Sequence, residues 1–208
     1  MAENITVFSS INRINRSTKN IYPVFQKAIR GLENGRAGLG FAKDFNKKSA
    51  DELCEMLKVA SSERYFQLYE AIRKGVSLEK LSEITHVKDY FLQQMKELVE
   101  LEEEMLKNIG SVPSDELLIQ AKKDGFSDKY LSKILKVSEK SIRDRRNALG
   151  IKEAWLAVPV SGVENANYYY STYNCSDTSK ASDNKKKIMI LGGGPNRIGQ
   201  GIEFSNIY

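Results

Sequence analysis

An internal repeat constrains the fold of this chain more than any other feature of its sequence. Seven residues of the stretch 71–87 recur, in the same order and spacing, fifty positions later in the stretch 121–137. The matching pairs are Ala71 and Ala121, Gly75 and Gly125, Ser77 and Ser127, Leu81 and Leu131, Ser82 and Ser132, Ile84 and Ile134, and Val87 and Val137. In each copy the glycine suits the end of one helix, the serine suits the start of a short second helix, and the valine precedes a third. The repeat therefore predicts a duplicated helix–turn–helix unit whose copies bury their apolar faces against each other.

Capping residues predict further helices before the repeat. Pro23 suits a first helical turn, and Gly31 suits the end of that helix. Residues 49–52, Ser-Ala-Asp-Glu, form a capping box that should open another helix. We expect Ser62 to begin the next one.

The middle of the chain reads as one long helix, and the region after the repeat reads as extended. Apolar residues recur at helical spacing over about 88–107. We expect the acidic run 102–104 near the end of that helix to be a solvated face. The apolar and tyrosine-rich segments 155–160 and 167–170 predict extended structure.

A glycine-rich stretch near the end of the sequence follows the apolar run 187–191. A buried parallel strand that turns into a phosphate-facing loop has this pattern, because glycine lets the backbone approach an anion closely. The glycine spacing fits neither the dinucleotide-binding pattern nor the P-loop, so a tight turn without a ligand stays open as the alternative.

The thirteen residues 192–204 resemble the start of the second synthetase half in the large subunit of carbamoyl phosphate synthetase. The resemblance implies an anion or substrate loop, whose candidate residues are Gly192, Gly193, Gly194, Asn196, Arg197, Gly199, Gln200 and Gly201. Arg197 would be the natural anion partner, because a guanidinium binds carboxylate or phosphate oxygens in bidentate fashion. Residues 26–33, Gln-Lys-Ala-Ile-Arg-Gly-Leu-Glu, are similar to an earlier segment of the same family. Further similar segments follow in the family's order at 90–92, 97–99, 101–103, 125–128 and 168–173. The resemblance covers roughly residues 15 to 204, and it implies a helical oligomerisation domain of the kind that lies between two ATP-grasp halves.

The resemblance, the lack of periodicity over 1–20 and the polar composition of 176–186 together predict four parts. They are a flexible arm over 1–20, a helical oligomerisation domain over 21–175, a linker over 176–186, and the truncated start of the second synthetase (pre-ATP-grasp) domain over 187–208. The expected fold class is thus mainly α, with a duplicated helix-turn-helix-like unit, short extended segments and the beginning of an α/β domain.

The resemblance also implies what the parent enzyme does. The family is an ATP-dependent ligase that makes carbamoyl phosphate from bicarbonate and glutamine-derived ammonia, for arginine and pyrimidine synthesis. MgATP would be bound in the parent, whereas we expect no cofactor and no catalytic residue in this chain, and we expect the chain alone to be inactive. The implied partners are further copies of the helical domain, the remaining large-subunit domains and the glutaminase small subunit. After Phe204 the sequence departs from the family pattern, with Ser205 where the family has aspartate.

Composition argues against a disulfide framework, a metal site and a membrane-spanning helix. Cys54 and Cys175 lie far apart, and their spacing suggests neither a disulfide framework nor a metal site. No apolar run approaches the ~20 residues that a membrane-spanning helix needs, so we expect no membrane partner and a cytoplasmic location. The only histidine, His86, lies at an expected helix end without a nearby nucleophile, and we expect it to be structural.

An alternative function comes from the charge of the second copy of the repeat. Residues 122–152 contain ten Lys and Arg against four Asp and Glu, a net charge of +6. Such a charge on a helix-turn-helix shape could bind nucleic acid. The matching stretch 72–102 has a net charge of −1, and Asp144 lies in the would-be recognition helix. We therefore favour an acidic protein partner or another copy of the chain, and nucleic-acid binding remains the alternative.

Overall fold

The computed structural model describes residues 21–32, 34–157, 169–173, 176–179, 183, 186 and 188. The elements within these residues are α2 (Tyr22–Gly31), the 3-10 helix η1 (Phe45–Lys47), α3 (Ala50–Leu57), α4 (Arg64–Arg73), α5 (Leu78–Thr85), α6 (Asp89–Leu106), α7 (Asp115–Lys123), α8 (Asp128–Leu135), α9 (Glu139–Ala148), β1 (Ala154–Ala157) and β2 (Tyr169–Thr172). The mainly α fold is confirmed. The chain divides after Thr178 into two units, and all the elements named above belong to the first. The expected arm 1–20 and the glycine-rich loop 192–201 lie outside the described residues.

Serine caps fix where most of these helices begin. Ser49 accepts a hydrogen bond from the amide of Glu52, whose side chain accepts one from the amide of Ser49, so the predicted capping box is present. Ser127 accepts in the same way at the start of α8 and Ser138 at the start of α9. The prediction that Ser62 begins a helix was wrong, because α4 begins at Arg64 after a turn and has no side-chain cap.

The predicted repeat is confirmed as two helical triplets, α4–α5–α6 and α7–α8–α9, which we call the first and second triplets. Gly75 ends the first helix of one triplet with a φ of 79°, and Gly125 ends that of the other with a φ of 92°. His86 and Lys136, also fifty positions apart, end the second helices in the left-handed conformation. His86 is thus a helix-terminating residue, in a backbone region where histidine is enriched among non-glycine residues.

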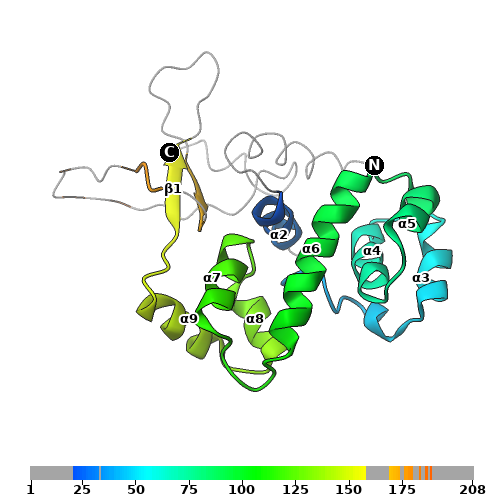
Figure 1. Ribbon diagram of the computed structural model, residues 1–208. Coiled ribbons are helices and arrows are strands. Elements are labelled where there is room, and N and C mark those ends of the chain that lie inside the picture. Colours follow the sequence, from blue (N-terminus) through cyan, green and yellow to red (C-terminus); the bar gives the residue numbers. More distant parts are fainter. Residues whose placement is uncertain are drawn as a thin grey trace, which may run out of the picture. The chain divides into compact units, whose positions relative to one another are not determined.

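The long helix α6 lies between α4 and α5 on one side and α8 on the other in Figure 1, and it contacts all three. Matching positions of the two triplets are buried together: Leu81 and Leu131 are fully buried, as are Leu92 and Ile142. Helices α2 and α3 pack against this body, α2 through α6 and α3 through α4 and α5. One continuous apolar core therefore joins the copies, as the repeat predicts.

Glu102 on α6 is the polar centre of this core, and its side chain has no exposed surface. Its carboxylate accepts hydrogen bonds from the hydroxyls of Tyr69 on α4, at 2.8 Å, and Tyr130 on α8, at 2.9 Å. Arg73 donates to the same carboxylate at 2.6 Å and also pairs with Glu70 and Glu103. The expectation that the run 102–104 is a solvated face was wrong for Glu102, because tertiary contacts cover it.

Burial sets the protonation behaviour of this centre. Burial raises the pKa of Glu102, although the Arg73 charge and the two tyrosine hydrogen bonds oppose the shift. Burial, and then the negative charge of Glu102, raise the pKa values of Tyr69 and Tyr130 well above the usual value. Both phenols therefore keep their protons and remain hydrogen-bond donors.

A glycine loop closes over the same centre. A Cβ atom at Gly40 would lie 2.5 Å from Glu102 Oε1 and 2.5 Å from the Tyr130 hydroxyl, so no side chain fits there. The next residue, Phe41, donates its amide to Glu70 Oε1 at 2.6 Å. The loop before η1 is thus fixed by the charges that join the two triplets.

After the second triplet, β1 and β2 form an antiparallel ribbon. Ala154 pairs with Thr172, and Ala157 pairs with Tyr169 at the other end of the register. The predicted extended structure is confirmed where the residues are described, whereas 158–168 lie outside them.

Replacing Gly40 by alanine tests whether this close approach holds the triplets together. We expect Gly40→Ala to lower the free energy of unfolding by about 1–3 kcal/mol, because the added methyl group must displace groups bonded to Glu102. Urea unfolding of the chain measures the loss. Gly31→Ala is the matched control, since a Cβ there meets nothing within 4 Å, and we expect it to be neutral or to stabilise by up to about 1 kcal/mol. Equal stability of the two variants would contradict this account of the loop.

Candidate functional site

A basic cavity of about 400 Å³ lies where α2, the α7–α8 turn and the β-ribbon meet. Its lining includes Pro23, Val24, Lys27 and Arg30 of α2, residues 125–129 of the turn and of α8, and 171–173 of the ribbon. Lys122, Glu139, Glu153 and Trp155 complete the wall. We call it the basic cavity.

The second triplet differs from the first at this place. Lys122 occupies the position of Ile72, and Asp128 occupies the position of Leu78. Lys122 is only 3% exposed, so a charged side chain has replaced a buried apolar one at the same point of the scaffold. Burying an ammonium is costly unless it is paired and hydrogen-bonded. The site must therefore supply partners that the first triplet lacks.

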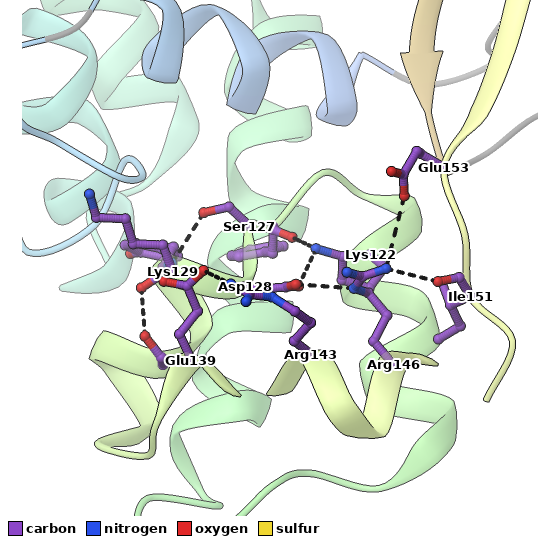
Figure 2. Close-up of polar contacts among 12 residues, drawn as sticks. Lys122, Ser127, Asp128, Lys129, Glu139, Arg143, Arg146, Ile151 and Glu153 are labelled. Carbon is purple, nitrogen blue, oxygen red and sulfur yellow. Dashed lines mark hydrogen bonds and ion pairs between the residues drawn. The ribbon is translucent and has the colours of Figure 1, made fainter. Parts of the chain in front are cut away.

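Figure 2 shows the polar contacts that Lys122, Asp128 and Arg146 make. Lys122 donates to Asp128 Oδ1 at 2.7 Å and to the carbonyl of Phe126 at 2.8 Å. Arg146 of α9 donates to the second oxygen of Asp128 at 3.0 Å and to the carbonyl of Ile151 at 3.0 Å. The carboxylate of Asp128 therefore joins α7, α8 and α9.

The ribbon covers these two cations with an aromatic ring. The Tyr173 ring centre lies 4.6 Å from Lys122 Nζ and 5.6 Å from the Arg146 guanidinium carbon. Partial burial raises the pKa of the Tyr173 hydroxyl, so the ring remains neutral. A cation over an aromatic face is attracted by the ring quadrupole, which helps to hold β2 beside the second triplet.

Burial and pairing act in opposite directions on the central carboxylate. Burial by itself would raise the pKa of Asp128, but the hydrogen bond from Lys122 and the charges of Lys122 and Arg146 lower it below its ordinary value. Burial lowers the pKa of Lys122, with the Asp128 pair opposing the change. The two charges thus stabilise each other, and the pair links α7 to α8.

Helix α2 supplies two further cations and approaches the turn very closely. A Cβ at Gly125 would lie 2.7 Å from the Pro23 backbone, so only glycine allows this contact. Arg30 donates to the Gly125 carbonyl at 2.7 Å, and Lys27 lies 3.5 Å from the Ser171 carbonyl. Desolvation lowers the pKa of Lys27 and of Arg30, and for Lys27 repulsion from Arg30 adds to it.

This arrangement of cations, a carboxylate and an aromatic ring is suited to binding. His86 and the buried Cys54 are the histidine and the cysteine within the described ranges, and neither lies in the lining. Across the described ranges no group of His, Cys, Asp and Glu is placed to hold a metal ion. Nor does any described helix have the length and apolar character needed to cross a membrane.

The sequence did not predict this cavity as a site, and the candidate site residues that it did suggest are different ones, later in the chain. Gly192, Gly193, Gly194, Asn196, Arg197, Gly199, Gln200 and Gly201 all lie outside the described residues. The sequence does contain one indication of the cavity, since a lysine stands at 122 where the repeat has isoleucine at 72. A charge at a core position of a duplicated scaffold points to partners that only one copy possesses.

The nucleic-acid alternative gains no support at α9, the helix that would read the duplex. Every basic side chain of α9 is paired with a carboxylate: Lys140 with Asp144, Arg143 with Glu139, Arg145 with Asp115 and Arg146 with Asp128. A duplex would have to displace these acids and then face their repulsion. The structure therefore gives the nucleic-acid function no support.

Comparison with known proteins yields one consistent result. A family described as the carbamoyl-phosphate synthetase large chain, oligomerisation domain, matches residues 14–150. The arginine-specific, chloroplastic carbamoyl phosphate synthase large chain of Arabidopsis thaliana is 40% identical over 187 residues, 86% of this chain and 15% of that protein. The carbamoyl phosphate synthase large chain of Pseudomonas aeruginosa is 39% identical, and that of Neisseria meningitidis serogroup B is 40% identical. Each of these two alignments covers 96% of this chain, and 19% and 18% of the respective relatives. The chain thus spans less than a fifth of the length of the three.

Substituting the central carboxylate tests the ion network. We expect Asp128→Asn to lower the free energy of unfolding at pH 7 by about 1–3 kcal/mol, because it leaves the buried Lys122 without its charged partner. The folded-state pKa of Asp128 is depressed, so its contribution is present above the ordinary aspartate value and is lost as the pH falls through the lower folded value. Urea unfolding between about pH 6 and pH 2 should therefore show a smaller acid-induced loss in the variant than in the wild type.

Asp144→Asn is the matched control for this experiment. Asp144 forms an exposed pair with Lys140, and such pairs contribute about 0–1 kcal/mol. A loss in Asp128→Asn no larger than in Asp144→Asn would show that the network is not structural.

Proposed function

The chain belongs to the carbamoyl phosphate synthase large-chain family, and on this basis we propose that it serves such an enzyme by assembling copies and connecting its two synthetase halves. The observation that carries the proposal is the extent of the family match. Residues 14–150 include every helix from α2 to α9, so the match covers the whole helical body and not a local motif. That body is of the oligomerisation type, which supports self-association as its role.

In this proposal the catalytic activity belongs to the longer parent enzyme of which the helical body is one part. It is the ATP-dependent synthesis of carbamoyl phosphate from bicarbonate and glutamine-derived ammonia, with MgATP bound by domains other than the helical body. The arginine-specific relative from Arabidopsis thaliana supports a link to arginine synthesis, and pyrimidine synthesis is the second route that the family implies. The remaining large-subunit domains and a glutaminase small subunit are the proposed partners, and the cytoplasm is the proposed location. We also propose the loop 192–201 as the anion or substrate loop of the second half, on the support of its sequence alone.

An apolar groove supports self-association through a particular face. The groove, of about 560 Å³, has an apolar wall made of Phe41, Leu106, Ile109 and Ile134 together with small residues of the glycine loop. Tyr130 and four cations complete its lining: Arg36, Lys43, Lys133 and Lys136. Phe41 is 41% exposed and Ile109 is 52% exposed, although both are large apolar side chains. Apolar side chains that gather at one exposed place are typical of protein interfaces. A second copy of the chain is the occupant that the family description favours.

The first test concerns activity. We expect these 208 residues, assayed alone with bicarbonate, ammonia and MgATP, to release no ADP and to form no carbamoyl phosphate above a sample without protein. The reason is that, among the residues that the structure describes, no group of His, Cys, Asp and Glu is placed to hold the Mg²⁺ that accompanies ATP. Turnover that rises in proportion to protein concentration would contradict the assignment of activity to the parent.

The second test concerns assembly. We expect sedimentation velocity to show a species larger than the monomer whose share rises with protein concentration. Ile109→Asp should raise the dissociation constant at least about tenfold, because a charge would be desolvated in the interface. Val59→Asp is the matched control, since Val59 is 71% exposed and lies outside the groove. A strict monomer at high concentration would overturn self-association, whereas assembly unchanged in Ile109→Asp would exclude this groove as its face.

A further inference from the structure

We propose that the basic cavity binds a small phosphate monoester between α2, the α7–α8 turn and the β-ribbon. The site goes beyond the proposed assembly role and does not depend on it. Three independent observations carry the proposal: the charge balance of the lining, the geometry that holds its cations in place, and the apolar part of the wall.

Some cations of the cavity lining have no carboxylate partner among the described residues. Lys122 and Arg146 are matched by Asp128 and by Glu153, and Glu139 is matched by Arg143. Lys27 and Arg30, by contrast, have no carboxylate partner among the residues that the structure describes, and Lys129 at the edge of the cavity has none there either. Lys27 and Arg30 lie one helical turn apart, and with no carboxylate partner in the described ranges their two charges match that of a phosphate dianion.

The cations are held in place before any ligand arrives. One guanidinium nitrogen of Arg30 is fixed by the Gly125 carbonyl at 2.7 Å, which leaves the other donors of its planar fork for an anion. Gly125 can lie there only because it has no side chain to meet Pro23. Lys27 is neighboured by Arg30, and their mutual repulsion together with desolvation makes a bound anion favourable at this point. A site whose donors are fixed in advance loses less entropy on binding.

The size and wall of the cavity favour an ester over the bare ion. A volume of about 400 Å³ falls in the range of small-molecule sites. Trp155 lines the cavity and is 45% exposed, and the partly buried Pro23 adds apolar surface. A ligand with a phosphate and a flat apolar group would thus contact both kinds of wall.

The protein contains its own reporter for the experiment. Trp155 is the only tryptophan in the sequence, so all tryptophan emission comes from a residue of the cavity wall. Inorganic phosphate and phenyl phosphate are titrated into the wild-type chain at constant ionic strength, with sodium chloride as the reference salt. We expect saturable changes in Trp155 emission with both phosphates, tighter binding of phenyl phosphate, and no saturation with chloride. Isothermal titration calorimetry provides the second readout.

Substitutions assign the binding to the proposed groups. Lys27→Met and Arg30→Met should each raise the dissociation constant at least about tenfold, the effect of losing one charged contact. Lys27 is exposed, so its variant keeps the fold even if Arg30→Met does not. Lys133→Met is the matched control, because Lys133 is a basic residue of the second triplet that lines the apolar groove and not the cavity. It should bind both probes like the wild type.

Three results would overturn the proposal. One is the absence of saturable binding of either phosphate below about 10 mM, where an interaction is too weak to be specific. Another is an equal loss of binding in Lys27→Met and Lys133→Met, which would mean attraction by overall charge. The third is binding of a polyglutamate peptide that depends on Lys27 while neither phosphate binds, which would make this surface a docking site for an acidic chain. Equal affinity for the two phosphates would contradict the preference for an ester, and the cavity would then be a site for inorganic phosphate only.

Discussion

Glu102 couples the two triplets, because its carboxylate accepts one hydrogen bond from Tyr69 and another from Tyr130. A buried charge of this kind costs several kcal/mol unless partners compensate it. Arg73 supplies the opposite charge, and the bare backbone at Gly40 leaves room for all four groups. The position of α8 depends on this centre. Its first residues line the basic cavity and its last residues line the apolar groove, so both surfaces inherit their geometry from one carboxylate.

Duplication explains why the chain can carry two surfaces of different chemistry on one scaffold. The triplets share their caps and their buried apolar positions, so the second copy folds by the same local rules as the first. It could then accept Lys122 in place of Ile72, because Asp128 and two carbonyl groups stand within reach of the buried ammonium and of Arg146. Lys122 and Arg146 of the second copy thus form part of a junction with the ribbon, where the Tyr173 ring covers both.

The family assignment and the surfaces support one coherent picture. A helical body of the oligomerisation type presents an apolar groove suited to a second copy, and on the same body it presents a basic cavity suited to an anion. Each surface can be changed without touching the other, since Ile109 belongs only to the groove and Lys27 only to the cavity. The two proposals can therefore fail separately, and assembly and ligand binding are open to independent measurement.

The sequence by itself determined the secondary structure, the repeat and the family. Caps such as Ser49 and glycine ends such as Gly125 act over a few residues, and the repeat compares the chain with itself, so no tertiary contact is needed to read them. Only the tertiary structure decided that Glu102 is buried and that Lys27 and Lys122 line one cavity. The burial of Glu102 and the lining of the cavity depend on contacts between side chains far apart in the sequence. Neither hydrophobic periodicity nor a count of charges predicts which of these side chains come into contact. The loop candidates at 192–201 remain predictions from sequence, because their chemistry needs neighbours that local pattern cannot supply.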